Sequence, residues 1–172
     1  MARSDGVVGE VRELASHVDT AEFGATRDVP VVQVVIGDGH RGQLDMRDPR
    51  AHVWIDVLTS LHATGRPAYV EIEPDTQRIT ELLLPLRFLV GGIRRVDDGL
   101  EVDLVISHAR HYLRRSNERF DELRAVLEAV FESRVPVLVT ESSDVHEIID
   151  VRPTGEPADD SYAQPIAPPS QA

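Results

Sequence analysis

Two segments of this sequence, residues 48–84 and 117–153, match each other at a constant offset of 69 residues. Identical residues occupy the pairs Arg50/Arg119, Val57/Val126, Leu58/Leu127, Pro67/Pro136, Val70/Val139, Asp75/Asp144 and Ile79/Ile148. An internal repeat of this length predicts two structural units of the same kind. It predicts little chemistry, because neither copy contains a motif that fixes an activity.

The composition is that of a globular protein without a membrane segment. With 172 residues and 41% hydrophobic residues, the chain is long enough for one domain or for two small fused units. It has no apolar run of about 18 residues, and its N-terminus lacks the layout of a signal peptide. The absence of cysteine excludes disulfides and thiol catalysis. We therefore expect a cytoplasmic protein with no membrane partner.

The charged residues are unusual in kind and in balance. All 18 basic residues are arginine, which is typical of a GC-rich genome and leads us to expect a bacterial protein. The net charge of −12 argues against nucleic acid as a partner, because nucleic-acid binding requires a positive surface potential. Residues 108–116 are a local exception, since they contain three arginines and no acid.

The two ends of the chain differ from its middle. Residues 1–28 predict an N-terminal arm with a short amphipathic helix, because apolar residues recur there at roughly helical spacing. These residues are Val7, Val8, Val11, Leu14, Ala15 and Val18. Residues 153–172 are rich in proline, alanine, serine and acids, and they predict a disordered acidic tail.

Each copy of the repeat predicts a β-α-β-β unit within an α+β domain at residues 29–152. The halves cover about residues 31–84 and 100–152, and residues 86–96 predict a linking strand with a bulge at its two glycines. Asp48-Pro49 and Asn117 are expected to start the two helices. Because one helix stripe cannot be buried alone, we expect the halves to share a mixed sheet or a partly closed barrel with two packed helices.

A His/Arg pair stands before each predicted helix. Aligning the preceding strands by their apolar positions places His40–Arg41 on Arg110–His111. Helix N-termini attract anions, and arginine binds carboxylate or phosphate with two parallel hydrogen bonds. The competing interpretation is that these arginines pair with the protein's own acids. The candidate anion-binding residues are Arg41, Arg110, Arg114 and Arg115, and the secondary acid–base candidates are His40 and His111.

The sequence gives little support for a metal or a cofactor. On a helix His108 and His111 would share one face, which makes them secondary metal candidates. No third ligand lies near them in sequence, and a zinc site needs at least three protein ligands. A distant residue such as His40 or Asp38 would have to complete the site. We therefore expect no metal and no cofactor.

Two functions are compatible with these observations. The first is a non-catalytic binding or scaffold module, expected as a homodimer, that engages a protein partner. It rests on the absence of a catalytic constellation and on residues 86–90, which predict an edge strand able to pair with another chain. The alternative is a small-molecule-binding protein or an enzyme that acts on a phosphate or carboxylate ligand at the two His/Arg loops. The first function implies that the protein is not an enzyme.

Overall fold

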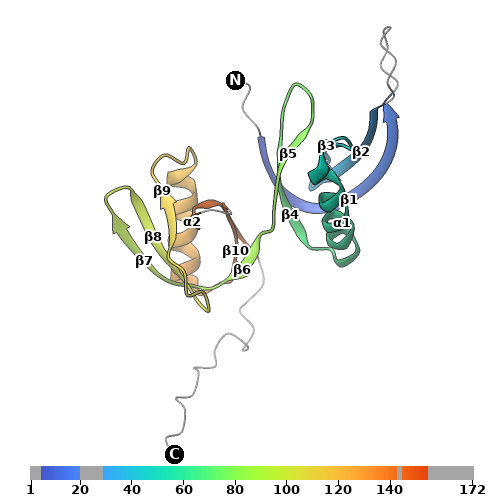
Figure 1. Ribbon diagram of the computed structural model, residues 1–172. Helices are drawn as coiled ribbons and strands as arrows, with labels where there is room; N and C mark the ends of the chain where they lie inside the picture. Colours follow the sequence, from blue (N-terminus) through green and yellow to red (C-terminus); the bar gives the residue numbers. More distant parts are fainter. Residues whose placement is uncertain (1–4, 20–28, 143–144, 155–172) are drawn as a thin grey trace, which may run out of the picture. The chain divides into compact units, whose positions relative to one another are not determined.

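The computed structural model describes residues 5–19, 29–142 and 145–154 (Figure 1). The side chains of Asp5, residues 16–19 and Val29 lie outside this description. The chain divides into two compact parts, Met1–Pro85 and Leu86–Ala172, which we call unit 1 and unit 2. The described residues form 11 strands and two helices, so the α+β class is confirmed. Neither helix is long and apolar enough to cross a membrane.

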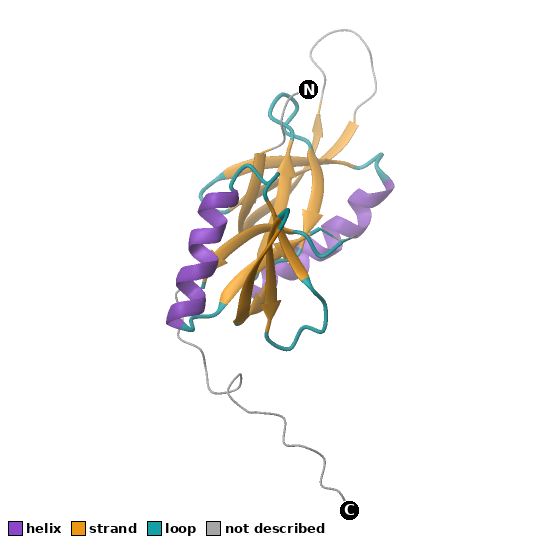
Figure 2. Ribbon diagram, turned by 90° about the vertical axis from the view of Figure 1, so that its left-hand side faces the viewer, coloured by secondary structure: helices purple, strands orange, loops and turns teal. Residues whose placement is uncertain are grey.

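Unit 1 is one antiparallel sheet with one helix packed on it (Figure 2). Its elements are β1 (Asp5–Asp19), β2 (Val29–Ile36), β3 (His40–Asp45), α1 (Pro49–Thr64), β4 (Pro67–Ile72) and β5 (Ile79–Leu83). The strand order is β3-β2-β1-β4-β5. Val34 from β2, Leu58 from α1 and Val70 from β4 are completely buried in the core between helix and sheet.

Helix α1 begins and ends where the sequence predicts. The Asp48 carboxylate accepts a hydrogen bond from the backbone N–H of Arg50, and Pro49 occupies the first helical position, where no N–H is needed. Gly65 ends the helix in the left-handed conformation, with φ 63°. Both signals are local, which explains why these boundaries could be predicted.

The helix predicted within residues 1–28 is wrong, because residues 5–19 form strand β1. The pairing of β1 with β2 shifts between Val11 and Glu13. Such an irregularity adds a residue and changes which face the following side chains occupy. Val7 and Val11 lie four residues apart, Leu14 follows three residues later, and all three pack in the core. A regular strand would place Leu14 on the opposite face, so the bulge gives this strand the apolar spacing of a helix.

Unit 2 contains the same order of elements in two smaller sheets. Its elements are β6 (Leu86–Phe88), β7 (Val90–Val96), β8 (Gly99–Leu104), β9 (His111–Arg114), α2 (Phe120–Ser133), β10 (Val137–Glu141) and β11 (Ile148–Pro153). The sheets have the orders β11-β10-β6 and β7-β8-β9. Strands β6 and β7 follow each other along the chain and together take the place that β1 has in unit 1. The predicted linking strand is therefore the beginning of unit 2.

Two further expectations are corrected by the strand pairing. Among the described residues, no sheet contains strands from both units, so the halves do not share a sheet. Each unit has five or more strands of its own, which is enough to cover its helix. The sheets are antiparallel rather than mixed, and parallel pairing is confined to isolated bridges, Gln43 with Arg78 and Tyr112 with Glu147. The glycine irregularity is present between Val90 and Gly92, as predicted.

Each unit has a backbone hydrogen bond at the same place in the repeat, with donor and acceptor in unit 2 lying 69 positions after those in unit 1. The N–H of Gln43 donates to the carbonyl of Gln77 at 2.8 Å, and the N–H of Tyr112 donates to the carbonyl of His146 at 3.1 Å. Gln77 and His146 both have left-handed backbones, with φ 56° and 51°. In each unit this bond connects a strand, β3 or β9, to the residue two positions before the last strand, β5 or β11. Of the predicted tail, Pro153 ends β11 and Thr154 follows it, and residues 155–172 lie outside the described part of the chain.

Candidate functional site

The two His/Arg pairs lie in strands rather than in loops directly before the helices. His40 and Arg41 begin β3 and are exposed, while Arg110 precedes β9 and His111 begins it. A complete strand therefore separates each pair from the helix that follows. The pairs therefore lie at the starts of strands and not at helix N-termini, and anion binding by these residues stays a prediction.

Three of the four candidate arginines interact with groups of the protein itself. Arg114 binds Asp98 at 2.5 Å and Glu147 at 3.3 Å, and its hydrogen bond with Asp98 raises the pKa of the guanidinium. Arg110 lies 4.0 Å from Glu101. Arg115 lies over the ring of Phe120 at 5.8 Å. This placement favours the competing interpretation for Arg114 above all.

A polar cluster in unit 2 brings together residues that are far apart in the sequence. His111 Nδ1 contacts the carboxylate of Glu141, and His111 Nε2 lies 2.7 Å from the hydroxyl of Ser107. His146 Nδ1 lies 3.4 Å from the second carboxylate oxygen of Glu141. One ligand atom from each of His111, Glu141 and His146 lies within 4.8 Å of the others. We call these three residues and Ser107 the His111 cluster.

The fold fixes the members of the His111 cluster at the junction of β9 with β11. His111 is the first residue of β9 and is only 2% exposed. Glu141 ends β10, where the pairing with β11 shifts after Thr140. The bond from Tyr112 N–H to the carbonyl of His146 connects His146 to β9. The cluster is thus built from the buried first residue of β9, the irregular end of β10 and a residue hydrogen-bonded to β9.

Unit 1 has none of these side chains at the corresponding positions. The equivalent hydrogen bonds of Gln43 and Tyr112 give an offset of 69, so the alignment of His40–Arg41 with Arg110–His111 is wrong by one residue. Sixty-nine residues before His111, Glu141 and His146 the chain has Gly42, Ile72 and Gln77. A Cβ on Gly42 would meet Cγ1 of Ile79 at 2.7 Å, so apolar atoms fill the space there. Apolar side chains therefore occupy this position in unit 1, and polar side chains occupy the corresponding position in unit 2.

The His111 cluster has two chemical capabilities. Its Ser107–His111–Glu141 chain has the order of hydrogen bonds found in serine hydrolase triads. Its His111, Glu141 and His146 set has the ligand number and type of an open zinc site. His108, the other metal candidate, is exposed and lies outside the cluster. The sequence does not connect Glu141 or His146 with His111, because the strand pairing that brings the three together is not visible in it.

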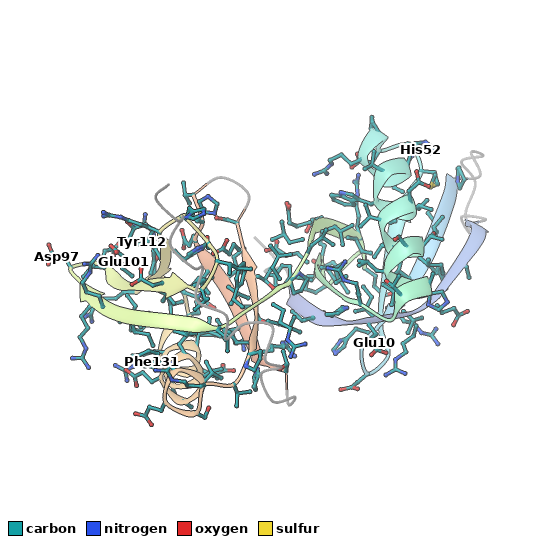
Figure 3. The ribbon with its side chains drawn as sticks, turned by 90° about the horizontal axis from the view of Figure 1, so that it is seen from below. Glu10, His52, Asp97, Glu101, Tyr112 and Phe131 are labelled. Carbon is teal, nitrogen blue, oxygen red and sulfur yellow. The ribbon has the colours of Figure 1, made fainter. Side chains whose placement is uncertain are left out.

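A groove lies on another face of unit 2, between β7 and α2. It has a volume of about 290 Å³ and is lined by Ile93, Arg95, Leu100, Glu128, Phe131 and Glu132. Phe131, labelled on α2 in Figure 3, is 39% exposed although it is a large aromatic residue. Strand β7 is an outer strand of its sheet.

Comparison with known proteins does not assign the chain to a family. No protein-family model matches it, and no curated protein or solved structure matches it at a significant level.

Proposed function

We propose that this protein is a non-catalytic binding module that holds an extended segment of a protein partner along β7, in the groove beside α2. The observation that supports this proposal is the combination of an outer strand with a groove next to it that is lined by both apolar and charged side chains. An outer strand has backbone donors and acceptors on its free side, and extended peptides bind such strands by adding a strand to the sheet.

Unit 1 provides a comparison at the same place. The residue 69 positions before Phe131 is His62, whose Nδ1 lies 2.7 Å from the carbonyl oxygen of Val11 in β1. In unit 1 the His62 side chain therefore covers the Val11 carbonyl of β1, the strand whose place β6 and β7 take in unit 2. The phenyl ring of Phe131 has no hydrogen-bonding group, so it supplies an apolar surface and leaves backbone groups for a partner.

The lining of the groove indicates the chemistry of the partner. Ile93, Leu100 and Phe131 offer apolar contacts, and Glu128 and Glu132 outnumber the single cation Arg95. The whole chain has a net charge of −12. An extended segment that alternates apolar residues with lysine or arginine matches these features, because side chains of a strand alternate between two faces. A second copy of this acidic chain matches them less well.

The proposal is tested with short fluorescent peptides that alternate leucine and lysine, measured by fluorescence anisotropy. We expect binding to the wild type and at least tenfold weaker binding to Phe131→Glu, because the new carboxylate removes the apolar contact. Val53→Glu is the matched control, since Val53 is 62% exposed on α1 in unit 1, and it should bind normally. A wild type that does not bind, or equal binding by both variants, would contradict the proposal.

The expected homodimer and the anionic ligand are tested separately. Sedimentation of the purified protein gives its oligomeric state. Arg41 and Arg110 are both exposed, and among the described residues Arg110 has only the 4.0 Å ion-pair contact with Glu101. A thermal shift with phosphate or dicarboxylate that disappears in an Arg41→Ala, Arg110→Ala double variant would support the alternative function of a small-molecule site.

We also propose that the two units arose by duplication of one β-β-β-α-β-β module whose sheet curls into a partly closed barrel. The hydrogen bonds from Gln43 to Gln77 and from Tyr112 to His146 support this proposal, because in both units they join β3 or β9 to the residue two positions before the last strand. The left-handed residues at both acceptor positions support it as well.

A further inference from the structure

We propose that His111, Glu141 and His146 bind one divalent transition-metal ion of the zinc type, with the Ser107 hydroxyl hydrogen-bonded to the other ring nitrogen of His111. Three protein ligands leave one tetrahedral position open for water or for a group of another molecule. This site is independent of the groove between β7 and α2 and goes beyond the proposed function.

The spacing of the ligand atoms suits such an ion. Ligands bound to zinc at about 2.0–2.1 Å in a tetrahedron lie about 3.3 Å from one another. His146 Nδ1 and Glu141 Oε2 are already 3.4 Å apart, and all three ligand atoms lie within 4.8 Å. The imidazole of His146 is 57% exposed, so it can rotate by the small amount that closure requires.

His111 is held in the orientation that a metal ligand needs. Its ring is 2% exposed, and Nε2 lies 2.7 Å from the Ser107 hydroxyl, so that Nε2–H can donate to this oxygen. The lone pair of Nδ1 then points towards Glu141, where the ion would bind. Metal-binding histidines usually donate their second ring N–H to a fixed acceptor in this way.

A metal site accounts for more of the cluster than a hydrolase triad does. The triad uses Ser107, His111 and Glu141 but gives no role to His146, whose ring centroid lies 5.6 Å from that of His111. The Ser107 oxygen also accepts a hydrogen bond from the N–H of Ala109 at 3.2 Å. A metal site gives each of the four side chains a function.

The ligand set selects among metals. Two imidazoles and one carboxylate suit Zn²⁺ and Co²⁺, whereas Mg²⁺ and Ca²⁺ prefer oxygen ligands. The absence of all three ligands from the equivalent positions of unit 1 makes the prediction local to unit 2.

The test is titration of the metal-free full chain with Zn²⁺ by calorimetry and with Co²⁺ by visible absorption. We expect one equivalent to bind, with the intense absorption bands of tetrahedral Co²⁺. His146→Asn should reduce the affinity most, because it removes a ligand while asparagine tolerates the left-handed backbone with φ 51°. Ser107→Ala should weaken binding by about 10–100-fold, as loss of a supporting hydrogen bond does.

His108→Asn is the control for this experiment, since His108 is an exposed histidine close to His111 in sequence but outside the cluster. It should bind metal like the wild type. Circular dichroism of each metal-free variant establishes that it is folded. Wild type and His146→Asn binding Zn²⁺ with equal affinity would overturn the proposal, and so would a wild type that binds neither ion. Phe131→Glu should retain metal binding, which separates this result from the peptide experiment.

Discussion

His111 and Glu141 should depend on each other for stability in the metal-free protein. Replacing either residue alone should lower the unfolding free energy almost as much as replacing both. His111 is 2% exposed, and its two ring nitrogens contact Glu141 and Ser107. Glu141→Leu leaves a buried ring nitrogen without its partner, which costs about 1–3 kcal/mol of unfolding free energy. Among the described residues, His111→Leu leaves the half-buried carboxylate with only His146 Nδ1, 3.4 Å away, and should cost a similar amount. Replacing both groups with leucine removes the unsatisfied atom and should cost little more than a single change.

The assay is a double-mutant cycle by urea denaturation, followed by far-UV circular dichroism in the presence of a chelator. We expect the double variant to be about 1–3 kcal/mol more stable than the sum of the single effects predicts. Trp54, the single tryptophan, packs against the core of unit 1, so its fluorescence reports on that unit in the same samples. Single effects that add to within about 0.5 kcal/mol would refute the reasoning, because independent groups behave in that way.

Three further predictions concern the backbone and pH. Ile106 has a left-handed backbone with φ 70°, which strains a β-branched residue, and its side chain is 73% exposed. Ile106→Gly should therefore raise the unfolding free energy by up to about 1 kcal/mol in urea denaturation. A loss of stability would contradict the strain at this residue. Gly99 has φ 145°, and a side chain there would overlap the carbonyl of Leu113. Gly99→Ala should therefore lower the unfolding free energy by about 3 kcal/mol or more. A melting temperature near that of the wild type would disprove this. Hydrogen bonds from Arg47 lower the pKa of Asp45 from 3.8 to about 2, so the stability that this carboxylate contributes is present above pH 4 and is lost as the pH falls towards 2. Asp45→Asn should therefore cost about 1 kcal/mol at pH 7 and clearly less at pH 2, where the native carboxylate is half protonated, and denaturation curves that differ equally at both values would refute this.

Local signals in the sequence predicted the start of α1 better than that of α2. Asn117, expected to start the second helix, is not its cap, because α2 begins at Phe120 with Arg119 at the N-cap. Asp48, Pro49 and Gly65 each act within one turn of α1, and all three have the predicted roles. Strand β1 was missed because its bulge after Val11 gives the apolar residues a helical spacing. Pairing partners far along the chain decide that residues 5–19 form a strand, and no local pattern contains that information.

The candidate site was only partly predictable for a related reason. His111 was recognised because it stands in an arginine-rich segment close to His108. Glu141 and His146 are brought to it by the pairing of β10 and β11 and by the bridge to β9, which depend on tertiary structure. Within their own segments they look like ordinary polar residues of a strand end and a turn.

The separate strand pairing of the two units has a consequence for synthesis of the chain on the ribosome. All strands that pair in unit 1 are translated before residue 86, and at about 5–20 residues per second the synthesis of residues 86–172 takes several seconds. Domains of this size commonly fold within that time. Two units with the same order of strands risk exchanging them, as repeated domains do when they refold together. Sequential emergence lets the first unit satisfy its own edges before the competing strands exist.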